Sequence, residues 1–229
     1  MEGRTALVAG ASGLVGAELL RLLLDGEDYQ RVHAVSRRPL PFDHVRLANR
    51  IMPIEQVEER LTGLKCHDAF CCIGSTRRKA GSDEELRRVD VELVLAFARA
   101  ARACGAQRFV VLSAAGADAS ARAGYLRHKA AMEAALGTVG FTSLDVLRPG
   151  LLLGFRRELR PAELAGTLLM PLVNPLLSGP LRQWRAVPAR DVAAAMVGAA
   201  RSLRRGTYVY AGEALAALAR SGRKPARAA

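Results

Sequence analysis

A glycine-rich turn, Gly10-Ala-Ser-Gly13-Leu-Val-Gly16, is the feature that most limits how this chain can fold. A short apolar run over residues 5–9 precedes the turn and is typical of a buried strand. Residues 14–24 follow the turn with apolar side chains at helical spacing. A buried strand that leads through a tight turn into a helix needs parallel neighbours to complete its sheet. The sequence therefore predicts an α/β fold.

The rest of the chain continues the alternation of strand and helix patterns. Further strands are predicted at residues 31–36, 68–73, 108–113, 141–147 and 207–210. Helices are predicted at residues 55–61, 82–105, 121–136, 191–203 and 212–219, and a capping box of Ser82 and Glu85 starts the second. This order favours a Rossmann-type doubly wound parallel sheet. The alternation weakens after Pro149, where a small C-terminal cap is expected.

The length and composition fit one globular domain. The chain has 229 residues, of which 50% are hydrophobic and 24% are charged. We expect a single NAD(P)-binding domain over residues 1–229, with residues 155–190 as a substrate-side cap and residues 220–229 as a disordered basic tail. No apolar run approaches the roughly 18 residues of a membrane-spanning helix, and the N-terminus lacks a signal-peptide layout. These features predict a cytoplasmic protein without a transmembrane segment.

Metal and specific nucleic acid are not expected as partners. The four cysteines, Cys66, Cys71, Cys72 and Cys104, match no zinc-binding spacing and indicate a reduced thiol set. The net charge is +12, and about half of it comes from the last 29 residues. Aromatic side chains do not interleave with this basic tail, and it carries no nucleic-acid motif. The tail is interpreted either as an anion-binding extension or as a solvated, frayed end.

The glycine turn has the context of a dinucleotide-binding site, because it follows a buried strand and opens a helix. In this interpretation Gly10 permits the tight turn and Gly13 lets the backbone approach a pyrophosphate. Gly16 permits close packing between the helix and the strand. The alternative is an ordinary strand-to-helix turn that happens to be rich in glycine.

A tyrosine and a lysine, Tyr125 and Lys129, are four residues apart on a predicted helix, so they share one face. A nearby positive charge stabilises phenolate and is expected to lower the pKa of Tyr125 from its usual value of about 10. A tyrosine of this kind can exchange a proton with an alcohol or a carbonyl near neutral pH. The alternative is a surface Tyr–Lys pair without a catalytic role.

These motifs together resemble the short-chain dehydrogenase/reductase superfamily, which combines such a glycine turn with Ser113 and Tyr125-x-x-x-Lys129. The match extends over most of the chain and ends near residue 210. It includes residues 70–82, Val89-Asp90, residues 113–117 and residues 147–154. These strings resemble the atypical branch around the Tat-interacting protein TIP30, also called CC3, whose bacterial members are labelled NAD(P)H-binding oxidoreductases.

The resemblance implies roles for individual residues. Ser113 would hydrogen-bond the substrate oxygen, and Tyr125 would be the general acid in reduction or the base in oxidation. Lys129 would bind the nicotinamide ribose and lower the pKa of the tyrosine. The remaining cofactor-binding residues are expected to be Gly10, Ser12, Gly13, Leu14 and Val15 at the pyrophosphate, Ile73 and Gly74 beside the adenine ribose, and Pro149, Gly150 and Leu151 near the nicotinamide.

The chain departs from the superfamily pattern at Asp90. Many members have an asparagine on the central helix that holds a proton-relay water, and Asp90 is the nearest candidate here. The departure puts the relay and its pH behaviour in doubt. Asp90 is interpreted either as a water-holding carboxylate or as a carboxylate on the helix surface.

Two arginines, Arg37 and Arg38, follow the second predicted strand. An acidic residue at this point would hydrogen-bond the ribose 2′-hydroxyl of NAD and repel a 2′-phosphate. Guanidinium groups instead pair well with phosphate, so NADP(H) is favoured over NAD(H). The alternative is a pair of solvent-facing arginines before a proline turn.

The sequence predicts an NADP(H)-dependent oxidoreductase that acts on a small-molecule carbonyl/alcohol pair. Two alternatives stay open: an NADP(H)-binding sensor or protein-interaction module with little catalysis, and an isomerase or dehydratase that holds its cofactor tightly. A homodimer and a protein partner are both compatible with the sequence.

Overall fold

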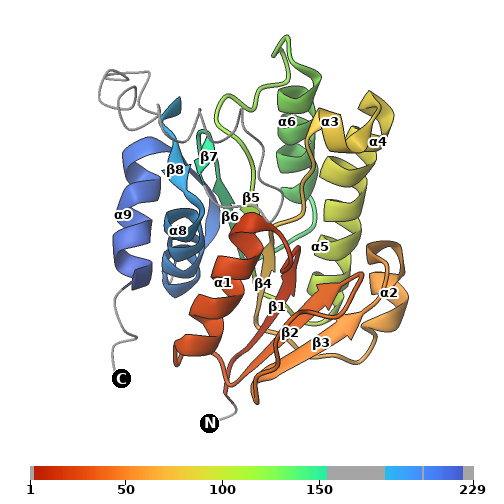
Figure 1. The fold of residues 1–229 in the computed structure, drawn as a ribbon, viewed down its shortest axis with the longest axis vertical. Helices are drawn as coiled ribbons and strands as arrows, with labels where there is room; N and C mark the ends of the chain where they lie inside the picture. The colour runs from red at the N-terminus through yellow and green to blue at the C-terminus, as the bar shows by residue number, and fades with distance from the viewer. Residues whose placement is uncertain (1–2, 154–183, 203, 224–229) are drawn as a thin grey trace.

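A seven-stranded parallel sheet forms the centre of the protein (Figure 1). The computed structural model describes residues 3–153, 184–202 and 204–223. The strand order is β3-β2-β1-β4-β5-β6-β9. These strands are β1 (Thr5–Ala9), β2 (Arg31–Ser36), β3 (Leu47–Ile51), β4 (Asp68–Cys71), β5 (Arg108–Leu112), β6 (Ser143–Leu147) and β9 (Gly206–Tyr210). The Rossmann-type doubly wound sheet predicted from the sequence is thereby confirmed.

Helices cover both faces of this sheet (Figure 1). Successive residues of β1 point to opposite faces, so Ala6 and Val8 join one hydrophobic cluster while Leu7 and Ala9 join the other. The first cluster contains residues of α1 (Leu14–Asp25), α8 (Ala189–Arg201) and α9 (Gly212–Arg223). The second contains residues of η1 (Ile54–Gln56), α2 (Val57–Arg60), α5 (Leu93–Ala103) and α6 (Gly124–Leu136). The sheet is thus buried between two helical layers.

The helix predicted over residues 82–105 has three parts. It begins at α4 (Asp83–Arg87), where Ser82 Oγ accepts a hydrogen bond from the Glu85 amide at 3.0 Å, as the capping box predicted. It continues through a π-helical segment, Arg88–Glu92, into α5. The π-helical segment has no counterpart in the sequence prediction. It is the part of the helix that carries Asp90.

Several short elements were missed by the sequence patterns. Among the described strands, β3 pairs only with β2, and its residues are half-buried or exposed. Its Asn49 and Arg50 interrupt the apolar pattern that is typical of a buried strand. The others are α3 (Arg77–Ala80) and a two-stranded sheet of β7 (Leu152–Leu153) and β8 (Val187–Pro188). Of the expected cap, only residues 184–190 are described. Of the expected tail, residues 220–223 form the end of α9, and the rest lies outside the described residues.

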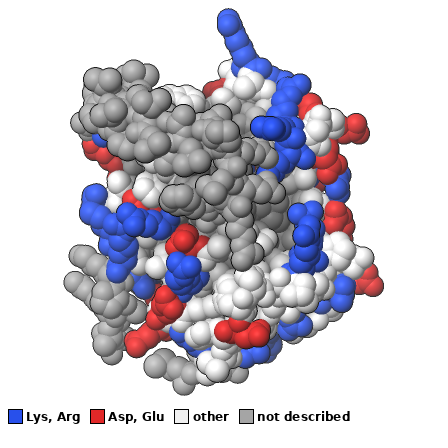
Figure 2. Space-filling view, viewed as in Figure 1, with Lys and Arg blue, Asp and Glu red and all other residues white. Residues whose placement is uncertain are grey.

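Charged side chains on the visible face do not form one continuous basic surface. Figure 2 shows Lys and Arg side chains lying among Asp and Glu side chains on this face.

Within the described ranges, no helix is both long and apolar enough to cross a bilayer.

Candidate active site at the carboxyl edge of the sheet

The expected site residues follow strands that end at one edge of the sheet. The parallel register places Ala9 of β1 opposite Val35 of β2 and Cys71 of β4, so these strands end together. The chain leaves β1 toward β2 and β3, then crosses to β4 on the other side of β1. Ligands of doubly wound sheets bind at such a reversal, beyond the carboxyl ends of the strands. The expected site residues at this edge are those of the glycine turn, Arg37, Arg38, Ile73, Gly74, Ser113, Pro149, Gly150 and Leu151.

The glycine turn is sterically closed to larger residues. Gly10 has a φ of +78°, and a Cβ atom there would lie 2.6 Å from the carbonyl carbon of Cys72. A Cβ atom on Gly16 would lie 2.1 Å from the carbonyl oxygen of Gly10. The turn therefore lies directly against the end of β4, at the reversal point of the sheet.

The first turn of α1 presents backbone amides without a side-chain cap. Gly13 is the N-cap residue, no side chain of the described residues accepts a hydrogen bond there, and the first turn contains no acidic residue. Ser12 and Gly13 are exposed, Leu14 is half-buried and Val15 is buried. Unpaired amides at a helix N-terminus favour an anion. The turn and this helix start therefore fit the pyrophosphate of a dinucleotide.

Arg37 and Arg38 lie exposed immediately after β2. Ser36 holds the backbone at this point, because its Oγ lies 2.7 Å from the Arg38 carbonyl oxygen and 2.8 Å from Asn49 Oδ1 of β3. Both guanidinium groups therefore extend from a fixed strand end at the same edge as the glycine turn.

Asp90 and Lys129 form a buried ion pair at the centre of the site. Lys129 Nζ lies 3.1 Å from Asp90 Oδ1, and the two side chains are 3% and 0% exposed. Asp90 Oδ1 also accepts the Ser75 amide at 3.2 Å, whereas Oδ2 has no hydrogen-bond partner among the described residues. A Cβ atom on Gly74 would lie 3.3 Å from Asp90 Oδ1. Asp90 is therefore an internal partner of Lys129, and its interpretation as a surface carboxylate is wrong.

Tyr125 keeps its proton in this environment. Burial, followed by the negative charge of Asp90, raises the pKa of Tyr125 to about 12. Lys129 Nζ lies 5.8 Å from the centre of the Tyr125 ring and is paired with Asp90. The expectation that Lys129 lowers the pKa of Tyr125 is therefore wrong, because burial of the phenol and the charge of Asp90 both raise it.

This shift predicts how Tyr125 titrates. Because folding raises the pKa of Tyr125 above its usual value of about 10, the neutral phenol stabilises the folded protein below that pH. The contribution is lost as the pH rises toward about 12. We expect the tyrosinate absorbance of wild type and of Tyr125→Phe to coincide through a pH of about 10 and to separate only as the pH approaches about 12. A tyrosinate near neutral pH that disappears in Tyr125→Phe would contradict this assignment.

Ser113, Glu133 and Arg148 form a second polar group, which meets α6 one turn beyond Lys129. Ser113 follows β5, is 4% exposed, and donates its hydroxyl hydrogen bond to Glu133 Oε1. Arg148 follows β6, and its Nε lies 2.9 Å from Glu133 Oε1. The sequence interpretation missed Glu133 and Arg148. Helical spacing could have found Glu133, which is four residues beyond Lys129 and shares its face of α6.

The segment after β6 connects the site to the last third of the chain. The carbonyl oxygen of Pro149 accepts a hydrogen bond from the Ala115 amide at 2.8 Å. The carbonyl oxygen of Leu151 accepts one from the Val187 amide at the same distance. Gly150 is half-buried and Leu151 is 52% exposed. Trp184 covers Gly116, where a Cβ atom would lie 2.4 Å from the indole. These contacts bring residues 184–188 beside the loop that follows Ser113.

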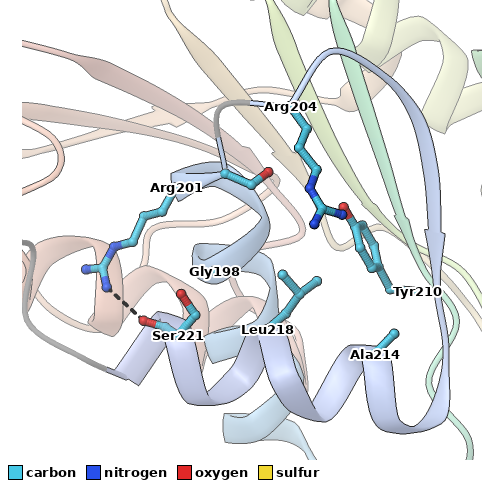
Figure 3. Close-up of a pocket in the computed structure, with 8 residues that line it drawn as sticks. Gly198, Arg201, Arg204, Tyr210, Ala214, Leu218 and Ser221 are labelled. Carbon is cyan, nitrogen blue, oxygen red and sulfur yellow. Dashed lines mark hydrogen bonds between the residues drawn. The ribbon is translucent and has the colours of Figure 1, made fainter.

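A separate hollow of about 280 Å³ lies between α8, β9 and α9 (Figure 3). Its Arg201 points toward Ser221, whose carbonyl accepts a hydrogen bond from the guanidinium at 3.3 Å, and it also binds Asp28 at 2.7 Å. None of its lining residues is among the expected site residues. The hollow is therefore distinct from the site at the carboxyl edge.

Comparisons with known proteins agree with this geometry. Residues 6–210 match the NAD dependent epimerase/dehydratase family. Protein HTATIP2 of Rattus norvegicus is 37% identical over 202 residues, which cover 86% of this chain and 81% of the relative. Protein FMP52, mitochondrial, of Debaryomyces hansenii is 32% identical, with 67% of this chain and 69% of the relative covered.

Solved structures share the fold at low sequence identity. MoeE5 in complex with UDP-glucose and NAD has a TM-score of 0.66 and 20% identity, with 94% of this chain and 80% of MoeE5 covered. The Bordetella bronchiseptica enzyme WbmH in complex with NAD⁺ has a TM-score of 0.68 and 18% identity, with 92% and 76% covered. At these identities the likeness establishes the fold.

The same comparisons overturn the expected cytoplasmic location. FMP52 proteins of Debaryomyces hansenii, Saccharomyces cerevisiae and Emericella nidulans all bear the word mitochondrial in their names. The expectation was wrong because it relied on the lack of a signal-peptide layout and of a membrane-spanning run, and neither feature specifies a compartment.

Proposed function

Because the chain belongs to the NAD dependent epimerase/dehydratase family, within its TIP30-like branch, we propose that it is an NADP(H)-dependent oxidoreductase acting on a carbonyl/alcohol pair. The observation that carries this proposal is that Lys129 lies beside the Tyr125 ring and pairs with Asp90 next to Gly74, at the sheet edge that also bears the glycine turn and Ser113. The family supports an NAD(P)-binding oxidoreductase in general terms. The substrate type and the cofactor preference are specific to this proposal.

The cofactor is proposed to bind along the carboxyl edge of the sheet. The backbone at Gly10, Ser12, Gly13, Leu14 and Val15 would hold the pyrophosphate, since the α1 amides have no side-chain cap. Ile73 and Gly74 would pass beside the adenine ribose, and Pro149, Gly150 and Leu151 would pack near the nicotinamide. Lys129 would donate to the nicotinamide ribose while Asp90 fixes its ammonium. When bound, the nicotinamide supplies or accepts the hydride.

Tyr125 is proposed to donate the proton that the substrate oxygen receives during carbonyl reduction. Its raised pKa, about 12, keeps the phenol protonated at neutral pH, which suits a general acid in carbonyl reduction. Asp90 holds Lys129 beside the ring rather than letting its charge act alone on the phenol. The arrangement therefore favours proton donation to a substrate oxygen over proton removal from it.

A second candidate function is an NADP(H)-binding sensor or protein-interaction module. One observation favours it: Lys129 and Ser113 are both engaged by internal carboxylates, those of Asp90 and Glu133. A sensor would bind the cofactor and consume none of it when offered a panel of aldehydes and ketones. Sustained NADPH consumption that depends on a carbonyl compound would exclude the sensor.

The first test is a titration of the purified protein with NADPH and NADH, followed by nicotinamide fluorescence. Replacing both Arg37 and Arg38 with alanine should weaken NADPH binding by roughly tenfold to a hundredfold, because charge-assisted hydrogen bonds to the 2′-phosphate are lost. NADH binding should change little. Arg21→Ala removes an exposed arginine of α1 as a matched control and should alter neither affinity.

Two outcomes would contradict the proposal. Equal loss of NADH and NADPH affinity in the double variant would show that these arginines do not recognise the 2′-phosphate. Failure of the wild-type protein to bind either nucleotide would remove the cofactor assignment altogether.

A further inference from the structure

The hydroxyl group of Ser113 is held between two strand ends and one helix. Ser113 and Arg148 follow the neighbouring strands β5 and β6, which pair Leu112 with Leu147. Glu133 lies on α6 between them, two turns beyond Tyr125 and one turn beyond Lys129. Its carboxylate contacts both groups: Oε1 accepts from Ser113, and both oxygens face the Arg148 guanidinium. The side chain of Glu133 is 10% exposed, so protein rather than water provides these contacts.

The chemistry of this group fixes the direction of the serine hydrogen bond. Arg148 binds Glu133 through Nε at 2.9 Å and through its terminal nitrogen, which is the two-point pairing of a guanidinium with a carboxylate. An ionised carboxylate accepts hydrogen bonds and donates none, whereas a serine hydroxyl has one proton and two acceptor lone pairs. Ser113 must therefore give its only proton to Glu133. Its oxygen can then accept a hydrogen bond from a ligand but can donate none.

We infer that Glu133 is a positioning residue that makes Ser113 a hydrogen-bond acceptor, so that the site recognises the hydroxyl form of its substrate pair. The inference rests on the proposed function, because it concerns the substrate oxygen that Tyr125 and Ser113 would share. An alcohol can donate to Ser113 Oγ, while a carbonyl oxygen would face a lone pair there. A carbonyl substrate must instead take its hydrogen bond from the Tyr125 phenol. The alcohol therefore binds more tightly than the matching ketone.

The inference can be tested with cyclohexanol and cyclohexanone, which differ at the one oxygen that matters. Ligand-observed NMR titrations would measure cyclohexanol on the NADPH-loaded protein and cyclohexanone on the NADP⁺-loaded protein, since neither mixture can react. Ser113→Ala should weaken cyclohexanol binding by roughly fivefold to tenfold, the value of one hydrogen bond, and leave cyclohexanone unchanged.

Glu133→Gln provides the second variant. Its amide NH₂ can donate to Ser113 Oγ, which frees the serine proton for a carbonyl oxygen. The ratio of cyclohexanol to cyclohexanone affinity should fall by roughly fivefold to tenfold relative to wild type. Glu27→Gln removes the same charge at an exposed position and should leave the ratio at the wild-type value. A merely structural role of Glu133 would weaken both ligands together.

The outcomes separate this inference from the proposed function. Weaker cyclohexanone binding in Ser113→Ala with unchanged cyclohexanol binding would show that Ser113 is a donor, and the inference would fall. An unchanged affinity ratio in Glu133→Gln would also overturn it. In both cases NADPH binding and carbonyl-dependent NADPH consumption by the wild-type protein would persist, so the proposed oxidoreductase would stand. Loss of NADPH binding by the wild type would instead remove the proposed function.

Discussion

Asp90→Ala should lower the free energy of unfolding by about 3–5 kcal/mol, the usual cost of leaving one charge of a buried pair without its partner. Lys129 is 3% exposed and its ammonium has Asp90 as a partner at 3.1 Å. The substitution would leave that charge in the core and would also remove the acceptor of the Ser75 amide. Urea denaturation followed by circular dichroism would measure the change.

The same helix provides a matched control for Asp90→Ala. Glu92 pairs with Arg87, but their side chains are 50% and 59% exposed. Exposed pairs contribute about 0–1 kcal/mol, so Glu92→Ala should be nearly neutral. Replacing Asp90 and Lys129 together with leucine and methionine should recover much of the lost stability. Equal effects of Asp90→Ala and Glu92→Ala would show that burial of the pair has no energetic consequence.

Tyr125→Phe should reduce the turnover of a carbonyl substrate by roughly a hundredfold or more, because a positioned general acid contributes about 10²–10⁴-fold. The variant keeps the ring, so the contact of Lys129 with the ring face and the Asp90–Lys129 pair should persist. NADPH affinity should therefore change little. Turnover would be followed as NADPH consumption with whichever aldehyde or ketone the wild-type protein reduces.

Tyr208→Phe is the control for this substitution. Tyr208 lies on β9, where its hydroxyl donates to the Arg205 carbonyl at 3.0 Å, and it should be catalytically silent. Retention of turnover in Tyr125→Phe would contradict the proposed mechanism. A loss of NADPH binding as large as the loss of turnover would instead mean that the phenol has a structural role.

The sequence predicted the order of strands and helices well, because a parallel sheet buried on both faces leaves uninterrupted apolar runs. The strand Thr5–Ala9, the glycine turn and the Ser82 cap depend on contacts within a few residues, which local patterns record. β3 was missed because an edge strand need not be apolar. Sequence patterns therefore predict best those elements whose residues are buried to the same extent along their whole length.

The charge pairings within the site could not be predicted from the sequence. The pairing of Lys129 with Asp90 joins residues 39 positions apart, and that of Ser113 with Glu133 joins residues 20 apart. Spacing on a helix correctly placed Tyr125 and Lys129 on one face of α6, but it could not show which residue of another element would meet the ammonium. Burial of the phenol and the nearby charge of Asp90, which together raise the pKa of Tyr125, depend on these contacts between distant elements.

The number of residues in the π-helical segment Arg88–Glu92 determines whether Asp90 faces Lys129. Such a bulge arises when one extra residue is accommodated in an α-helix, and each residue turns an α-helix by about 100°. Loss of one residue from this segment would restore a regular helix and carry Val89 or Val91 to the position of Asp90. A single-codon deletion would thus replace a buried carboxylate with an apolar side chain and leave the Lys129 ammonium without its partner in the core. Among descendants of this gene, helix length at this point would mark which copies retain the ion pair.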